Sequence, residues 1–246
     1  MLEVTPLPRT GTLNPVPENQ NRERRTPNAE RLVGLFDRIA PRKTDIDVQA
    51  PGAPAPGDDP VFGTKALRKF LASLTARESP ILLDLGPVVG SNVSFFGEQL
   101  GCKIFVEDIF ADLDRHVREG KLEELPEFLK RRFRRDDASV DGILCWDVID
   151  YLDRPAAQEL ATQLTRVLRP DGALLAFFGT AAQRESMYTK FIVVDELNLK
   201  YKPYPALRGR QAVFLNRDII RLFSGLRVQD SFLLQNNLRE ILFRKS

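Results

Sequence analysis

The sequence predicts a three-layer, doubly wound α/β fold, with a mostly parallel sheet of the seven-strand type and an antiparallel hairpin at its C-terminal end. Two observations predict it. From residue 61 onward, short apolar runs alternate with helical patterns, as is typical of parallel strands joined by helices. The last two apolar runs are separated only by residues 235–237, and so short a connection permits only antiparallel pairing.

Four apolar runs are expected to form the parallel part of the sheet. They are nearly uninterrupted, as expected of strands that are covered on both faces. They span residues 81–86, 102–107, 140–146 and 173–178, and the hairpin follows at 226–234 and 238–245.

The helices between the strands follow from apolar residues at spacings of three and four. The clearest helix begins after Asp153, which is placed to cap it, with Pro155 in its first turn. Another is expected to be capped by Asn216 and to end at Gly225. The remaining helical patterns cover residues 64–75, 91–100 and 112–135.

Residues 1–60 differ from the rest and are expected to form a largely disordered extension, which leaves the α/β domain over residues 61–246. Ten of the 17 prolines lie in this extension, and proline is excluded from helix interiors and central strands. One short helix is expected over residues 29–40, where apolar residues at helical spacing lie between Asn28 and Pro41. It can dock on its own domain or on a partner.

The charge balance and the short apolar runs argue against some classes of partner. Formal net charge is +2, so the chain has no overall field that attracts nucleic acid or an anionic membrane. No run approaches the roughly 18 apolar residues of a membrane-spanning helix. The first residues lack the basic start and apolar core of a secretory signal. We therefore expect a cytoplasmic protein whose partner is neither nucleic acid nor membrane.

Three further signals are interpreted as structural. Cys102 and Cys145 are expected to be buried free thiols on separate strands, and with a single histidine they do not predict a metal site. His116 is expected on the surface of a helix. The basic run 130–135 follows several glutamates, so a solvated helix of mixed charge explains it as well as a phosphate site does.

Three strand ends carry the chemistry of a ligand site. In a doubly wound sheet the ligand binds at the carboxyl ends of the strands, where strand order reverses. The loop after the first strand holds Asp84, Gly86 and Gly90, and its glycines permit a sharp turn and close approach of a ligand. Glu107 ends the next strand with Asp108 beside it, and an acid here can accept both hydroxyls of a ribose.

In these motifs the chain resembles the class I S-adenosylmethionine-dependent methyltransferases. Its segment DLGPVVG (84–90) is similar to the first motif of that family, an acid followed by spaced glycines, and Glu107 matches the acid of the second motif. The stretches VDGILCWDVIDYL (140–152) and AQELATQLTRVLRPDGALLAFF (157–178) resemble the later strand, helix and turn of the family. The resemblance covers residues 62–246 and implies S-adenosylmethionine as cofactor.

The resemblance also implies roles for individual residues. Gly86 and the backbone of Pro87 would line the methionine portion of the cofactor, and Asp84 would bond near its amino group. Glu107 would hold the ribose hydroxyls. Trp146 would lie near the methionine portion or the acceptor. The full set with an implied contact is Asp84, Gly86, Pro87, Gly90, Glu107, Asp108, Trp146 and Asp147.

Three features depart from the family pattern. Val88 stands at the middle glycine position, and a β-branched residue resists positive φ, so with Pro87 it predicts an altered loop. The stretch 107–140 is short and charged and offers no clear third strand, which leaves Asp136 or Asp137 as the candidate for an adenine contact. No paired histidine and acid identifies a catalytic base.

The leading hypothesis is an enzyme that transfers a methyl group to a small or medium-sized nucleophile, presented by residues 187–204. Two alternatives remain open. Val88 and Pro87 favour a binding or scaffold protein that has kept the fold and lost the cofactor. A nicotinamide-dependent oxidoreductase uses a similar glycine turn and ribose acid, but the chain lacks G-x-G-x-x-G and the terminal hairpin suits that class poorly.

Overall fold

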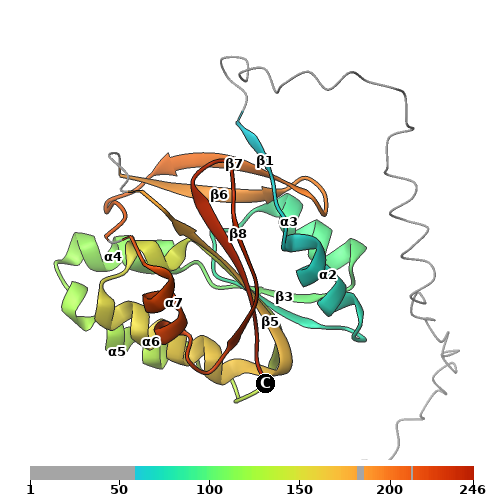
Figure 1. Ribbon diagram of the computed structural model, residues 1–246. Coiled ribbons are helices and arrows are strands. Elements are labelled where there is room, and N and C mark those ends of the chain that lie inside the picture. Colours follow the sequence, from blue (N-terminus) through green and yellow to red (C-terminus); the bar gives the residue numbers. More distant parts are fainter. Residues whose placement is uncertain (1–58, 182–185, 212) are drawn as a thin grey trace, which may run out of the picture. The chain divides into compact units, whose positions relative to one another are not determined.

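The computed structural model describes residues 59–181, 186–211 and 213–246 (Figure 1). The expected disordered extension and the helix predicted over residues 29–40 lie outside these ranges. The main sheet has the strand order β3-β2-β4-β5-β9-β8. Its strands are β2 (Ile81–Asp84), β3 (Lys103–Val106), β4 (Val140–Trp146), β5 (Leu168–Gly179), β8 (Arg227–Leu233) and β9 (Leu238–Arg244).

Strands β3, β2, β4 and β5 run parallel, and the antiparallel pair β9 and β8 extends the sheet beyond β5. The predicted α/β class and the terminal hairpin are therefore confirmed. Strand order reverses at β2, which has β3 on one side and β4 on the other. This reversal is where a doubly wound sheet opens a crevice at its carboxyl edge.

Within the described residues the sheet has six strands, one fewer than the predicted seven-strand type, and β3 lies at its edge. The chain between β3 and β4 forms only helices: α4 (Ile109–Glu119), the 3-10 turn η2 (Leu122–Glu124) and α5 (Leu125–Arg132). Gly120, at φ 67°, ends α4 in the left-handed conformation that glycine adopts readily. The charged helix formers of this stretch thus form two amphipathic helices and leave no apolar run for a third strand.

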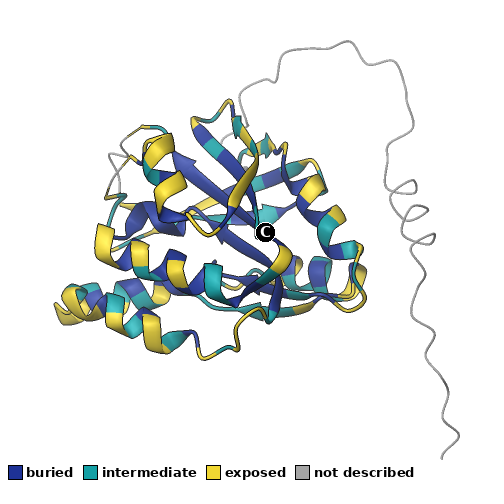
Figure 2. Ribbon diagram, turned by 60° about the horizontal axis from the view of Figure 1, so that its bottom comes forward, coloured by how far each residue is buried: buried dark blue, intermediate teal, exposed yellow. Residues whose placement is uncertain are grey.

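Helices cover both faces of the sheet (Figure 1). On one side lies α2 (Leu67–Thr75), whose apolar residues are buried as predicted, and α3 (Gly90–Ser94), which continues as the π-helical turn η1 (Phe95–Gln99). On the other side lie α4, α5, α6 (Arg154–Val167) and α7 (Asn216–Leu222). The central strands between these layers are buried (Figure 2).

Local predictions for individual residues have mixed outcomes. The carboxylate of Asp153 accepts a hydrogen bond from the Ala156 N–H at 3.0 Å and caps α6 as expected. Both cysteines are buried free thiols, as expected. The predicted cap at Asn216 is wrong, because the cap position of α7 is Leu215 and no side chain bonds there. The prediction of a surface His116 is also wrong.

His116 is 6% exposed. Its imidazole Nδ1 lies 2.7 Å from the backbone oxygen of Asp112, and its ring packs against Phe128. The helix α5 covers this face of α4, which the charge pattern alone did not indicate.

A second sheet, of order β1-β7-β6, was not predicted. It contains β1 (Val61–Gly63), β6 (Met187–Val193) and β7 (Asn198–Pro205), and β6 and β7 pair antiparallel. The stretch between the strand 173–178 and the last helix was expected to be irregular, and no strand was predicted in it. Tyr188, Phe191 and Val193 of β6 are nevertheless buried.

Candidate active site

The carboxyl ends of β2, β3 and β4 meet at one edge of the main sheet. Asp84, the last residue of β2, pairs with Val106 on β3 and with Leu144 on β4. The backbone N–H of Glu107 donates to the carbonyl of Asp84 at 2.7 Å. This register brings together Asp84, Glu107 and Trp146, three of the residues singled out from the sequence.

Asp84 is buried and its carboxylate is held by two donors. Oδ1 accepts from the Gly86 backbone N–H at 2.9 Å and from the Trp146 indole N–H at 2.6 Å. Burial raises the pKa of Asp84 to about 6, although both hydrogen bonds act to lower it. The carboxylate therefore organises the glycine loop and fixes the indole above it.

The indole of Trp146 lies directly against Gly86. A β-carbon placed on Gly86 would lie 2.9 Å from Cδ1 of Trp146 and 3.0 Å from its Nε1, so only glycine fits beneath the ring. Trp146 is 2% exposed, and its φ of 49° is uncommon for a residue with a side chain. Strain of this kind collects at functional sites.

Two phenylalanines extend the indole into a stack of near-parallel rings. The Trp146 ring centroid lies 5.1 Å from that of Phe191, with planes 3° apart, and Phe177 lies 5.1 Å from Phe191. Phe191 comes from β6, whose backbone is held by Asn92 of α3. The amide of Asn92 donates to the carbonyl of Phe191 at 2.8 Å and accepts from the N–H of Val193 at 2.9 Å.

Glu107 forms ion pairs with two arginines. Its Oε2 contacts the guanidinium of Arg132, and its Oε1 lies 3.4 Å from that of Arg135. Arg135 also stacks on the ring of Phe105, 4.0 Å from the centroid. The ion pairs of Glu107 were not predicted, because the basic run 130–135 was interpreted as part of a solvated helix. The carboxylate predicted to hold a ribose thus has two protein cations beside it.

A buried charge cluster adjoins the end of β4. Arg210 donates to Oδ2 of Asp147 at 3.0 Å and lies 3.6 Å from Oδ2 of Asp150, and both carboxylates are fully buried. The second oxygen of each carboxylate has no hydrogen-bond partner among the residues that the structure describes. Burial raises the pKa of Asp150 to about 8 and also raises the pKa of Asp147. The guanidinium of Arg210 is therefore shared between two buried carboxyl groups, those of Asp147 and Asp150.

Arg210 and Asp150 were not singled out from the sequence. Gly179, at the end of β5, makes room for the guanidinium, since a β-carbon there would lie 2.3 Å from the arginine. The Gly179 N–H donates to Asp150 at 2.6 Å. The available signal was this glycine at a strand end, together with Asp147 just before the 3-10 turn η3 (Val148–Tyr151) and Asp150 within it.

The remaining predicted residues lie at the rim of the site. Asp108 caps α4 by accepting from the Ala111 N–H at 3.0 Å. Gly90 begins α3 and has open space where a β-carbon would lie. Val88 is 64% exposed and is not among the residues with positive φ. Pro87 is half-buried. The side chain that covers the glycine loop is therefore Trp146, and Val88 points outward.

Asp137, one of the two candidates for an adenine contact, pairs with Arg166 at 2.6 Å and is largely exposed. It belongs to the turn before β4, at the amino end of that strand, whereas the cofactor site is expected at the carboxyl end. The structure therefore does not bring Asp137 to the edge formed by Asp84 and Glu107.

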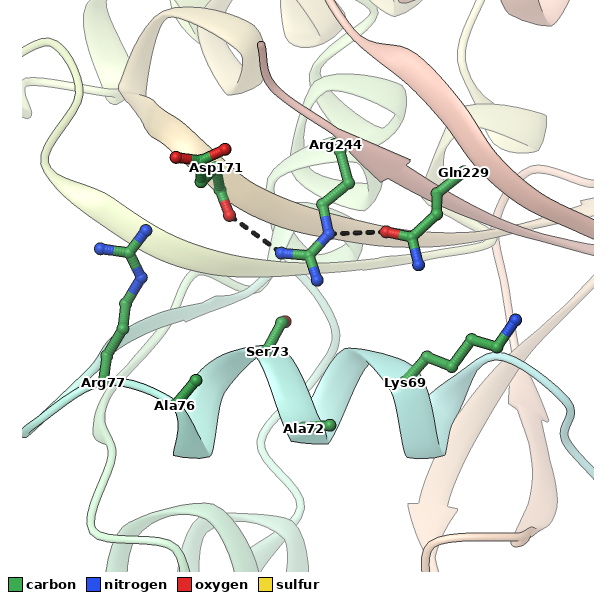
Figure 3. Close-up of a pocket in the computed structure, with 8 residues that line it drawn as sticks. All are labelled: Lys69, Ala72, Ser73, Ala76, Arg77, Asp171, Gln229 and Arg244. Atoms are coloured by element: carbon green, nitrogen blue, oxygen red, sulfur yellow. Dashed lines mark hydrogen bonds between the residues drawn. The ribbon is translucent and has the colours of Figure 1, made fainter.

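A groove of about 620 Å³ lies elsewhere, between α2 and the strands β8 and β9 (Figure 3). Its cations already have partners, since Lys69 pairs with Asp230 and Arg77 with Asp141. Arg244 donates to Gln229 at 2.7 Å. None of the residues that line it belongs to the predicted cofactor set. They are Lys69, Ala72, Ser73, Ala76, Arg77, Asp171, Gln229 and Arg244.

Within residues 59–181, 186–211 and 213–246, no group of three or more histidines, cysteines and acids is placed to hold a metal ion. In the same part of the chain, no helix has the length and apolar character needed to cross a membrane.

Comparison with known protein families gives one match within the main sheet. Residues 83–176, from β2 through most of β5, match the family model described as a methyltransferase domain. This stretch includes Asp84, Gly86, Glu107 and Trp146. This part of the chain is therefore similar to a methyltransferase domain. No curated protein matches the chain.

Solved structures show a loose likeness. A 1,6-didemethyltoxoflavin-N1-methyltransferase from Burkholderia thailandensis, solved with S-adenosylhomocysteine, is 18% identical at a TM-score of 0.43, over 74% of this chain and 78% of that one. An S-adenosylmethionine-dependent methyltransferase from Aquifex aeolicus is 14% identical at 0.45, over 73% and 89%. The protein PH0226 from Pyrococcus horikoshii is 16% identical at 0.44, over 74% and 92%.

The residues present fit this cofactor only in part. Asp84 and Glu107 lie at adjacent strand ends, and Gly86 leaves its backbone without a side chain of its own. The indole of Trp146 nevertheless lies against that backbone. In this arrangement the indole covers the part of the Gly86 backbone to which the resemblance assigns the methionine portion.

Proposed function

We propose that this protein is a methyltransferase that binds S-adenosylmethionine at the carboxyl edge of β2, β3 and β4 and acts on a small or medium-sized nucleophile. The observation that carries the proposal is the convergence of Asp84, Gly86 and Glu107 at the point where strand order reverses. Bound there, the cofactor supplies an activated methyl group.

Each cofactor residue has a role that its chemistry supports. Glu107 accepts hydrogen bonds from the ribose hydroxyls, for which it exchanges its contacts with Arg132 and Arg135. Asp84 accepts from the amino group of the methionine portion. Gly86 lets that portion approach the backbone closely.

The acceptor side is assigned to the second sheet and the charge cluster. Strand β6 reaches the site through Phe191, and Tyr204 of β7 lies near Tyr188 with ring centroids 5.4 Å apart. Aromatic walls of this kind hold a small acceptor by stacking and by excluding water. Methyl transfer depends mainly on such positioning.

Calorimetric titration with S-adenosylhomocysteine tests the proposal. We expect saturable binding to the native chain and at least tenfold weaker binding to Glu107→Gln, because an amide is a poorer acceptor for two hydroxyls than a carboxylate. Glu127→Gln is the matched control, since Glu127 contacts only Arg131 at 3.9 Å on an exposed helix face. Equal affinity of Glu107→Gln and the native chain contradicts the assigned site.

A second candidate function is supported by the contacts of Trp146. Asp84, Glu107 and Asp147 each already have a protein partner: Trp146, the arginine pair and Arg210 respectively. In a scaffold protein that has lost the cofactor, these carboxylates would also be paired with protein hydrogen-bond donors and cations. Absence of binding at millimolar ligand, in both the native chain and a variant without the indole, distinguishes that candidate.

A further inference from the structure

We propose that Trp146 is the gate of the cofactor site: its indole takes the place of the methionine portion in the ligand-free chain and is displaced when the cofactor binds. This inference rests on the proposed function and adds a means of control to it. The gate is a side chain of the chain itself, so access depends on the fraction of molecules in which the indole has left Gly86.

Three contacts hold the gate closed. The indole N–H donates to the buried carboxylate of Asp84 at 2.6 Å, which is a charge-assisted hydrogen bond. The edge of the ring rests on Gly86, where no side chain fits beneath it. The face of the ring stacks on Phe191 at 5.1 Å. Together these contacts fill the space above the glycine loop with protein atoms.

The backbone beneath the indole supports a second position for the ring. Trp146 has φ of 49°, and the pairing of β4 with β5 is irregular between Leu144 and Trp146. This conformation is costly for a residue with a side chain, and it persists because the surrounding contacts hold it. When a ligand replaces the contacts with Asp84 and Gly86, a shift of the Trp146 backbone relieves this strain and moves the ring with it.

The ring of Trp146 is the element that moves, because β6 is fixed. The side-chain amide of Asn92 forms two hydrogen bonds with the backbone of β6, one with the carbonyl of Phe191 and one with the N–H of Val193. Lifting β6 from the site requires breaking both of these buried hydrogen bonds. Displacement of the indole breaks only one hydrogen bond, which the amino group of the cofactor can replace on Asp84.

The composition provides a direct readout, because Trp146 is the single tryptophan of the chain. Its intrinsic fluorescence therefore reports on the gate alone. In the ligand-free chain we expect blue-shifted emission that acrylamide quenches poorly, since the side chain is 2% exposed. On saturation with S-adenosylhomocysteine we expect a red shift and a several-fold larger quenching constant.

Removal of the gate provides the second test. Trp146→Ala is expected to bind S-adenosylhomocysteine about tenfold to a hundredfold more tightly than the native chain, which corresponds to about 1.4 to 2.8 kcal/mol. Phe128→Ala is the matched control, since Phe128 packs on His116 away from the site, and its affinity should equal that of the native chain. The fluorescence of the native chain needs no variant, so the test holds even if Trp146→Ala does not fold.

The outcomes separate the gate from the proposed function. A fluorescence change in the native chain, or binding by Trp146→Ala alone, supports the gate. Binding to the native chain with unchanged emission and quenching, together with equal affinity of Trp146→Ala, overturns the gate and leaves the proposed function standing. Absence of binding by both folded proteins at millimolar ligand overturns the proposed function, and the gate with it.

Discussion

The indole N–H of Trp146 donates to the carboxylate of Asp84 across 2.6 Å, and this contact joins the end of β4 to the end of β2. The two residues are 62 positions apart in the sequence. Their contact closes the glycine loop at the point where the sheet's strand order reverses. The first prediction concerns this hydrogen bond.

Replacing Trp146 with Phe should destabilise the fold by about 1.5 to 3 kcal/mol at pH 8. The variant keeps an aromatic ring in the stack and removes a donor from a buried carboxylate that is ionised at that pH. Urea unfolding monitored by circular dichroism measures the change. Tyr204→Phe is the control, because the Tyr204 hydroxyl has no hydrogen-bond partner in the described part of the chain and its loss should leave stability within about 0.5 kcal/mol. Equal stability of Trp146→Phe and the native chain contradicts the prediction.

Gly86→Ala should lower stability by about 1 to 3 kcal/mol, because its β-carbon would lie 2.9 Å from the indole and the ring would have to shift. Gly90→Ala is the matched control on the same loop. It has open space and begins a helix, so we expect it to be neutral or to stabilise by up to about 1 kcal/mol. Thermal unfolding of the two variants should therefore shift in different directions or by clearly different amounts.

Arg210→Met should destabilise the fold by about 3 to 5 kcal/mol, since it leaves two buried carboxylates without a cation. Adding Asp150→Asn to this variant should recover part of the loss, because one of the two buried carboxyl groups that lost the cation is then removed. A double-mutant cycle from urea unfolding measures the coupling. Additive losses would show that the arginine and Asp150 do not interact.

Stability should fall as pH rises from about 4 to 8. Burial raises the pKa of Asp84 to about 6 and that of Asp150 to about 8, whereas an aspartate in the unfolded chain titrates near 3.9. In this window the folded state retains protons that the unfolded state has lost. Each such proton lowers the free energy of unfolding by about 1.4 kcal/mol per pH unit.

The variant Asp150→Asn tests the pH dependence of stability between pH 6 and 8. Between pH 6 and 8, where Asp84 has already ionised, the slope of the native chain should be steeper than that of the variant. Urea unfolding at a series of pH values compares the two slopes. Parallel slopes would place the responsible proton on another group.

The sequence predicts the parallel strands well because their apolar runs are local signals. It also predicts that Asp84, Gly86, Glu107 and Trp146 meet at one edge, since this follows from the topology alone. It does not predict that Trp146 occupies the space above Gly86. That position depends on Phe191, whose strand carries lysines and was interpreted as irregular.

The charge partners were missed for a related reason. Arg132 and Arg135 follow a run of glutamates, so their pattern fits a solvated helix as well as an ion pair with Glu107. Arg210 lies in an irregular segment with no period that shows which way its side chain points. Contacts between distant segments carry this information, and neither local periodicity nor composition contains it.

The central claim is that S-adenosylmethionine binds against Gly86 once the indole has moved. The most direct measurement is a crystal structure of the native chain grown with S-adenosylhomocysteine. We predict the methionine portion of the ligand on the Gly86 backbone, the Glu107 carboxylate on the ribose hydroxyls and the Trp146 ring displaced from Asp84. A structure in which the ligand lies elsewhere while the indole still rests on Gly86 would contradict the account.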